Sequence, residues 1–302
     1  MDQETSLADR AEGAAESRVP PDPQGVAVAL LFRAALVLAT GAALLFLLLP
    51  IVAVFLRVPL GDLISALGSS AALDAIRVTA ETNAFAMVLI LGFGTPAAYW
   101  IARRRGAVRD VVVTLVELPL VLPPAVAGIG LLVAFGRAGL LGDTVDALGI
   151  DIAFTKVAVV LAVTFVASPF YLRTAVAAFE GVDPTLPAAA RTLGAGEGRV
   201  FLRVMLPLSK GGLGAGAALA FARGLGEFGA TIMFAGSLQG VTQTLSLAIY
   251  EQFDLDFDVA LAISALLIAV SAVVLLSVKL MSRWHSGSGS LTLFAASSRQ
   301  PT

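Results

Sequence analysis

Few ionisable side chains lie inside the long apolar runs of this sequence, and among them are Arg223, Glu227 and Glu117. Arg223 and Glu227 are four residues apart, one turn of a helix, and Glu117 lies in an earlier run. A charge at the centre of a bilayer costs about 2.5–3.5 kcal/mol on insertion scales, so such residues pair with one another or face a polar path. Two readings of Arg223 and Glu227 stay open: a self-neutralising ion pair, or electrostatic tuning of a path for an anion. Glu117 is expected to form an ion pair near the membrane interface.

The runs that hold these charges also contain residues able to line or close a path. Pro123 and Pro124, preceded by Pro119, remove backbone donors and must distort their helix. Irregular backbone at membrane depth is tolerated only against protein or a water-filled cavity, so both prolines are candidate path-lining residues. The candidate gate residues combine rings that can block a narrow path with a hydroxyl that can donate to an oxyanion: Phe228, Thr231 and Phe234.

Several kinds of chemistry are excluded by what the sequence lacks. It has no cysteine, and its one histidine, His285, lies near the C-terminus, which leaves no thiolate or histidine metal site and no Ser/His pair in the apolar runs. It has no G-x-x-x-x-G-K-[ST] loop for ATP hydrolysis. With 20 Lys and Arg against 22 Asp and Glu, it has no basic excess for nucleic acid. We therefore expect no catalytic residue, metal or cofactor in this chain, and no binding to nucleic acid.

The composition is that of a membrane protein. Hydrophobic residues make up 58% of the 302 residues and charged residues 14%, against roughly 45–50% and about 25% in soluble domains. A membrane-spanning helix needs about 20 apolar residues, and lipid is then its solvent. The run Gly211–Ala235 also contains Gly212 and Gly216, and two glycines at this spacing let helices pack closely. The sequence predicts an all-α membrane protein with six transmembrane helices: Ala34–Leu56, Ala84–Ala102, Val111–Phe135, Val157–Phe179, Gly211–Ala235 and Val259–Val278.

The distribution of positive charge predicts the orientation. Fifteen of the 20 Lys and Arg residues fall on the side of the two termini when Arg173 is counted with the loop after the fourth run. Because positive loops stay inside, both termini are expected in the cytoplasm. Residues 1–25 and 284–302 are polar or rich in Pro, Ser and Gly and are predicted to be disordered cytoplasmic tails. Residues 26–283 form the predicted transmembrane domain.

The loop between the fourth and fifth runs, residues 183–207, predicts a short helix. Asp183 suits the N-cap, Pro184 the first helical position and Gly194 a left-handed residue after the end. Four residues at i, i+3, i+4 and i+7 form one apolar stripe on this helix: Leu186, Ala189, Ala190 and Leu193. We expect another protein surface to cover this stripe.

The same loop resembles a known motif. Ala189-Ala190, Gly194 and the segment 204–207 match the spacing of E-A-A-x-x-x-G-(x)9-I-x-L-P in binding-protein-dependent ABC importer permeases, with Ala188 in place of the glutamate. The resemblance implies a coupling helix seated in a cleft of a separate cytoplasmic ATPase. The implied ATPase-coupling residues are Leu186, Ala189, Ala190, Arg191, Leu193 and Gly194.

A second stretch is similar to the molybdate permeases. It covers residues 226–236 and 242–250, and the likeness extends over roughly Thr79 to Val278. Thr242, Gln243 and Thr244 are expected outside the membrane, as donors to an oxyanion or its carrier or as a plain polar turn. Sulfate and tungstate permeases share much of this pattern, so the anion stays open among the three.

The resemblance implies the rest of the assembly. It indicates the type I ABC importer permease architecture, a homodimer in the cytoplasmic (inner) membrane with the path on its two-fold axis, and ATP-driven import of molybdate. The implied partners are a cytoplasmic ABC ATPase dimer, which holds ATP and Mg, and an extracytoplasmic molybdate-binding protein. An alternative from another class is a membrane enzyme or assembly factor that uses Arg223 and Glu227 for chemistry.

Overall fold

The computed structural model describes residues 23–57, 60–147 and 149–286, and the regular elements in these ranges are all helices. The chain falls into two units, Met1–Leu56 and Arg57–Thr302, which are described separately. The helices are α2 (Pro23–Arg57), α3 (Leu60–Leu67), α4 (Ser70–Ala102), α5 (Ala107–Val121), α6 (Pro124–Phe135), α7 (Gly142–Ala147), α8 (Lys156–Glu180), α9 (Thr185–Thr192), α10 (Glu197–Val200), the π-helical turn η1 (Phe201–Met205), α11 (Leu206–Leu225), α12 (Gly229–Ala235), α13 (Leu245–Leu255) and α14 (Phe257–Ser286).

The predicted spans are present, with changes in their limits. Five helices are long and apolar enough to cross a membrane, and a sixth span results if the bent pair α5 and α6 counts as one. α2 begins at Pro23 and α14 ends at Ser286, so each of these helices reaches three residues into a predicted tail. The remainder of both tails, residues 1–22 and 287–302, lies outside the described residues.

The third span is broken where the prolines predict distortion. α5 and α6 meet at an angle of 111°. Pro123 and Pro124 lie at the junction, with Pro124 as the first residue of α6 and Pro119 still inside α5. Because proline lacks an N–H and its ring clashes with the carbonyl four residues earlier, two successive prolines end one helix and begin another.

The fifth span differs from the prediction at both ends. The predicted limits Gly211–Ala235 are wrong, because the helical segment runs from Glu197 to Leu225 and α12 is a separate short helix. Pro207 lies inside this segment without ending it. η1 precedes the proline, and the Leu206 N–H donates to the Phe201 carbonyl five residues back. This wider turn lets the chain remain helical through the proline.

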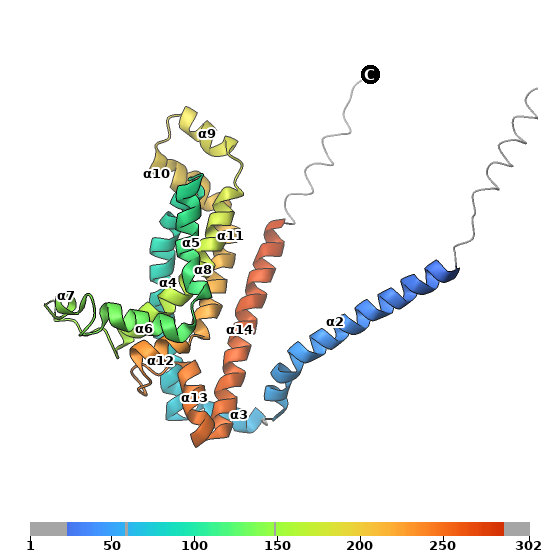
Figure 1. Cartoon of the computed structure of the whole chain (residues 1–302), viewed down its shortest axis with the longest axis vertical. Helices are drawn as coiled ribbons and strands as arrows, with labels where there is room; N and C mark the ends of the chain where they lie inside the picture. Colours follow the sequence, from blue (N-terminus) through green and yellow to red (C-terminus); the bar gives the residue numbers. More distant parts are fainter. Residues whose placement is uncertain (1–22, 58–59, 148, 287–302) are drawn as a thin grey trace, which may run out of the picture. The chain divides into compact units, whose positions relative to one another are not determined.

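The second unit is built around α8. α4, α5 and α11 each pack along it, with α9 and α10 at one end of these helices and α3 and α13 at the other (Figure 1). Glycine permits the approach of α11: a Cβ on Gly212 would lie 2.5 Å from the Ala178 Cβ, and one on Gly216 would lie 3.0 Å from the Thr174 Cβ. The close packing predicted for Gly212 and Gly216 is confirmed.

Two short helices pack against each other at the bend. α6 and α12 pack together beside α8. A Cβ on Gly128 would lie 2.6 Å from the Ala230 carbonyl oxygen, and one on Gly229 would lie 2.6 Å from the Pro124 Cβ. The bend in the third span and the break after α11 therefore fit against each other at backbone distance.

Neighbouring glycines on α11 provide a test of this packing. We expect Gly212→Ala to lower the thermal stability of the purified protein, since the added methyl group overlaps Ala178 and overpacking costs about 1–3 kcal/mol. Gly211→Ala is the matched control, because a Cβ there meets nothing within 4 Å. Both changes gain the same helix propensity, about 1 kcal/mol. Equal melting temperatures for the two variants would contradict the close α8–α11 contact.

Candidate functional site

A side-chain cap fixes the start of the helix α9. One oxygen of Asp183, Oδ1, accepts from the backbone N–H of Thr185 at 2.9 Å and from its hydroxyl at 2.7 Å. The N-cap is Pro184, one residue later than predicted, although Asp183 still supplies the capping acceptor. These bonds, the backbone one first, hold the pKa of Asp183 below its ordinary value. The cap is thus present at neutral pH and is lost only as pH falls through that lowered pKa.

The end of α9 follows the prediction. Gly194 has φ of 81°, in the left-handed region that favours glycine. The N–H of Leu193 donates to the Ala189 carbonyl at 3.1 Å, and that of Ala195 donates to the Ala190 carbonyl at 3.0 Å. The last carbonyls of the helix are therefore satisfied by the chain itself, and the helix stops before α10.

One residue of the apolar stripe of α9 packs against the protein, and the other three are exposed. Ala190 is partly buried and packs against the core cluster that contains Phe179 and Val200. Leu186 is 46% exposed and Leu193 is 88% exposed, with Ala189 also exposed. An apolar surface on a short surface helix is typical of a docking site.

A network of ion pairs ties α9 to the membrane helices. Glu197 forms ion pairs with Arg103 at the end of α4 and with Arg191 of α9, the latter at 3.0 Å. Arg103 also lies over the ring of Tyr99, 5.3 Å from its centroid. The Tyr99 ring contacts that of Phe201, with 4.8 Å between centroids. Sequence reasoning missed Glu197 because 94 residues separate it from Arg103 and no local pattern joins them.

Arg223 and Glu227 form the ion pair that the sequence predicts, and its position inside the membrane stays a prediction. Arg223 Nη2 lies 2.7 Å from Glu227 Oε2, and the Glu227 side chain is 1% exposed. The other oxygen of Glu227 accepts from the Ala230 N–H at 2.7 Å and so caps α12. The prediction that the two residues share one helix is wrong, because α11 ends at Leu225, before Glu227. Glu227 thus neutralises a cation and begins the next helix.

The candidate gate residues have different surroundings in the subunit. Phe234 is fully buried in the core cluster that contains Leu131 and Val159. Thr231 is also fully buried, and its hydroxyl has no hydrogen-bond partner within the described ranges. The Phe228 ring lies 5.2 Å from that of Tyr250. Pro123 and Pro124 are exposed at the bend of the third span. A gating role for any of them stays a prediction.

The segment Thr242–Thr244 is not the exposed turn that its composition suggests. Thr242, Gln243 and Thr244 are 0%, 2% and 3% exposed. The Leu238 N–H donates to the Thr242 hydroxyl at 3.0 Å, and the Leu238 carbonyl accepts from the N–H groups of Thr242 and Gln243. The Gln243 amide donates to Glu251. The Thr242 and Gln243 side chains therefore bond to their own loop and to α13, whereas the Thr244 hydroxyl has no hydrogen-bond partner in the described ranges. All three side chains are buried in the subunit, and their contact with an oxyanion or its carrier stays a prediction.

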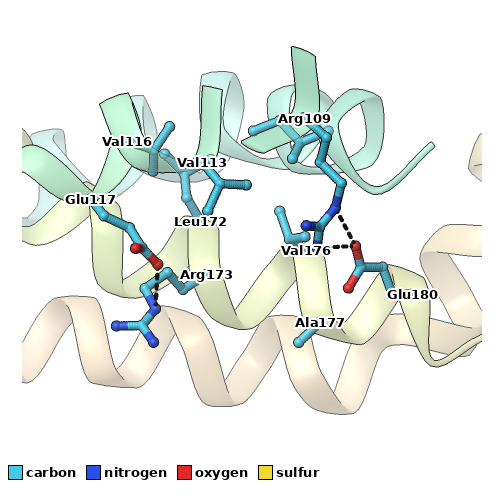
Figure 2. A pocket seen from close by; sticks show the side chains of 10 residues that line it. Arg109, Val113, Val116, Glu117, Leu172, Arg173, Val176, Ala177 and Glu180 are labelled. Atoms are coloured by element: carbon cyan, nitrogen blue, oxygen red, sulfur yellow. Dashed lines mark hydrogen bonds and ion pairs between the residues drawn. The ribbon is translucent and has the colours of Figure 1, made fainter. Parts of the chain in front are cut away.

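Two cavities lie along the contact between α5 and α8. The larger, about 190 Å³, contains two ion pairs (Figure 2): Arg109 with Glu180 at 2.7 Å and Arg173 with Glu117 at 3.1 Å. The ion pair predicted for Glu117 is confirmed. Its partner Arg173 lies within α8 and not in the following loop, as the charge count had assumed.

The smaller cavity, about 120 Å³, lies at the bend of the third span. Its lining comes from the end of α5, the start of α6, the middle of α8 and the end of α11: Pro119, Leu120, Leu122, Pro124, Ala127, Val166, Phe170 and Arg223. The structure thus brings together two features that the sequence predicts separately, the proline-broken span and the charged pair.

Comparison with known proteins identifies the group to which this chain belongs. Residues 94–286 match the family described as binding-protein-dependent transport system inner membrane component. The chain is 45% identical over 237 residues to the molybdenum transport system permease protein ModB of Mycobacterium tuberculosis, covering 78% of this chain and 90% of that protein. It is 40% identical over 249 residues to a probable molybdenum ABC transporter permease protein of Haloferax volcanii, covering 81% and 89% of the two chains.

The fold agrees with this relationship. A bacterial alginate ABC transporter, solved with a pentasaccharide-bound periplasmic protein, matches 86% of this chain and 96% of its own with a TM-score of 0.66 at 17% identity. At that identity the likeness concerns the fold alone. The protein is a multi-pass membrane protein of the binding-protein-dependent transport system inner membrane component family, with the fold of a type I ABC importer permease.

Proposed function

We propose that this chain is the transmembrane permease subunit of an ATP-driven ABC importer for molybdate. The relatives that are 45% and 40% identical over most of the chain carry molybdenum transport in their names. The observation that carries the proposal is α9, a capped helix whose Leu186 and Leu193 are exposed while Ala190 packs against the core. Such a helix needs a partner surface, and an ATPase subunit supplies both that surface and the energy.

We infer the rest of the assembly from the family to which the chain belongs. Two copies of this chain form a homodimer in the inner membrane, with both termini and α9 on the cytoplasmic side. An ABC ATPase dimer, which binds ATP and Mg, covers the exposed leucines of α9. An extracytoplasmic molybdate-binding protein delivers the anion to the opposite end, where α3 and α13 lie.

The geometry indicates how movement would pass from the ATPase into the membrane. Glu197 joins α9 to α4 through Arg191 and Arg103. From Glu197 the helical segment continues for 29 residues to Leu225, which is about 43 Å at 1.5 Å per residue. A displacement of α9 would therefore move this helical segment, whose C-terminal end lies next to the Arg223–Glu227 pair. Closure of the ATPase would open the path outward, and hydrolysis would reverse the change.

The function is tested by ATPase activity of the complex in lipid. We expect molybdate-loaded binding protein to stimulate hydrolysis, and the same protein offered tungstate or sulfate identifies the preferred anion. Leu193→Asp should abolish co-purification of the ATPase, because it places a charge in an apolar contact. Leu140→Asp is the matched control, since Leu140 is 86% exposed at a loop far from α9 along the chain. If no ATPase co-purifies with the unaltered chain, the importer function is wrong.

The end of α9 offers a milder test of coupling. Gly194→Ala places a side chain at φ of 81°, which costs about 1 kcal/mol, and we expect it to lower the stimulated ATPase rate without preventing assembly. Gly198→Ala is the control, because Gly198 lies inside α10 with open space at its Cβ. Equal stimulation in the two variants would contradict a requirement for this helix end.

A further inference from the structure

The smaller cavity lies near the middle of the membrane-spanning helices. Val166 and Phe170 line it from α8, which runs from Lys156 to Glu180. At 1.5 Å per residue they lie roughly 15 and 21 Å from the start of this helix and about the same distance from its end. A cavity at this depth is far from both ends of α8.

Arg223 is the one charged residue in the lining of this cavity, and the other lining residues are apolar or proline. Its side chain is 28% exposed, whereas that of its partner Glu227 is 1% exposed, so the carboxylate is the more deeply buried of the pair. In the part of the chain that the structure describes, the contact with Glu227 is the one polar interaction recorded for the guanidinium. Five N–H donors on a guanidinium leave most of them in need of an acceptor.

The smaller cavity is one of two that lie along α5 and α8. The larger cavity follows it towards the α9 end, lined by the stretch of α8 from Leu172 to Glu180 and by α5 before Pro119. Arg173 and Arg109 face that cavity, each with a glutamate partner (Figure 2). Guanidinium groups are thus placed in succession along the groove between α5 and α8, from mid-depth to the end that carries α9.

We propose that Arg223 is a binding residue for the transported oxyanion, at a mid-depth site between the bend of the third span and α8. Arg173 and Arg109 mark the route from this site towards α9. The inference rests on the proposed function and names a site for its substrate. A guanidinium suits a tetrahedral dianion because its N–H groups can form two parallel charge-assisted bonds with two oxygens.

The glutamate partner keeps the affinity of the site for the anion moderate. An unpaired arginine in an apolar cavity would attract a dianion strongly and release it slowly, whereas transport needs binding that is favourable yet easily reversed. Glu227 offsets the charge of Arg223 and is itself fixed by the Ala230 N–H. The pair can therefore receive an anion without retaining it.

The test removes both charges together. Arg223→Gln alone would leave Glu227 buried and unpaired, which is strongly destabilising, so the informative variant is Arg223→Gln/Glu227→Gln. A glutamine at 227 can still accept from the Ala230 N–H. In proteoliposomes with the ATPase and molybdate-loaded binding protein, we expect uptake of labelled molybdate to fall roughly tenfold or more, as for loss of charge-assisted hydrogen bonds. Co-purification of the ATPase with the variant should be unaltered, because the surface proposed for that contact is α9.

Controls separate this site from the general function. Arg137→Gln/Asp151→Asn removes an exposed ion pair of 2.8 Å and should import normally. Arg223→Lys, which keeps the charge, should import faster than the double glutamine variant. Uptake by the double glutamine variant at the unaltered rate would overturn the role of Arg223, and so would uptake by Arg223→Lys no faster than that of the double glutamine variant. Absence of uptake by the unaltered complex with any loaded oxyanion would instead overturn the proposed function.

Discussion

The close approach of α4 and α11 to α8 is the constraint on which the rest of the structure depends. Lipid gives no hydrophobic driving force for helix association, so contact at backbone distance has to supply the packing energy. Gly94 and Gly216 lie against the ring of Tyr171, and Gly212 lies against Ala178. The Tyr171 hydroxyl is in turn bonded to Thr95 at 2.6 Å. Small residues on the neighbours and one large ring on α8 thus set the spacing of these helices.

This tight centre determines where irregular backbone can lie. The prolines bend the third span by 111°, and the carbonyls and N–H groups freed there need protein partners. α12 fills the space beside the bend, with Gly229 against Pro124 and Gly128 against Ala230. Glu227 connects this region to α11 by capping α12 and pairing with Arg223. One buried carboxylate therefore links the break in the fifth span to the cavity at the break in the third.

The two functional ends of the molecule are joined by the same helical segment. Its first residue, Glu197, binds arginines of α4 and α9, and its last turn carries Arg223. The ion pairs at the α9 end are largely exposed, and single exposed pairs stabilise little, about 0–1 kcal/mol. These ion pairs act by positioning α9, because a carboxylate shared by two guanidinium groups limits how α9 can move relative to α4.

The sequence by itself determined the features that depend on local chemistry. Hydrophobic length predicts the spans, Pro123 and Pro124 predict the distortion, and Gly194 with its preceding apolar stripe predicts α9 and its end. Only the tertiary structure decided where the fifth span begins, because the chain stays helical from Glu197 through Pro207. It also decided that Thr242–Thr244 fold inward, that Glu197 joins two distant arginines, and that Arg223 meets the bend of the third span. These contacts unite residues far apart in the chain, and no local propensity encodes them.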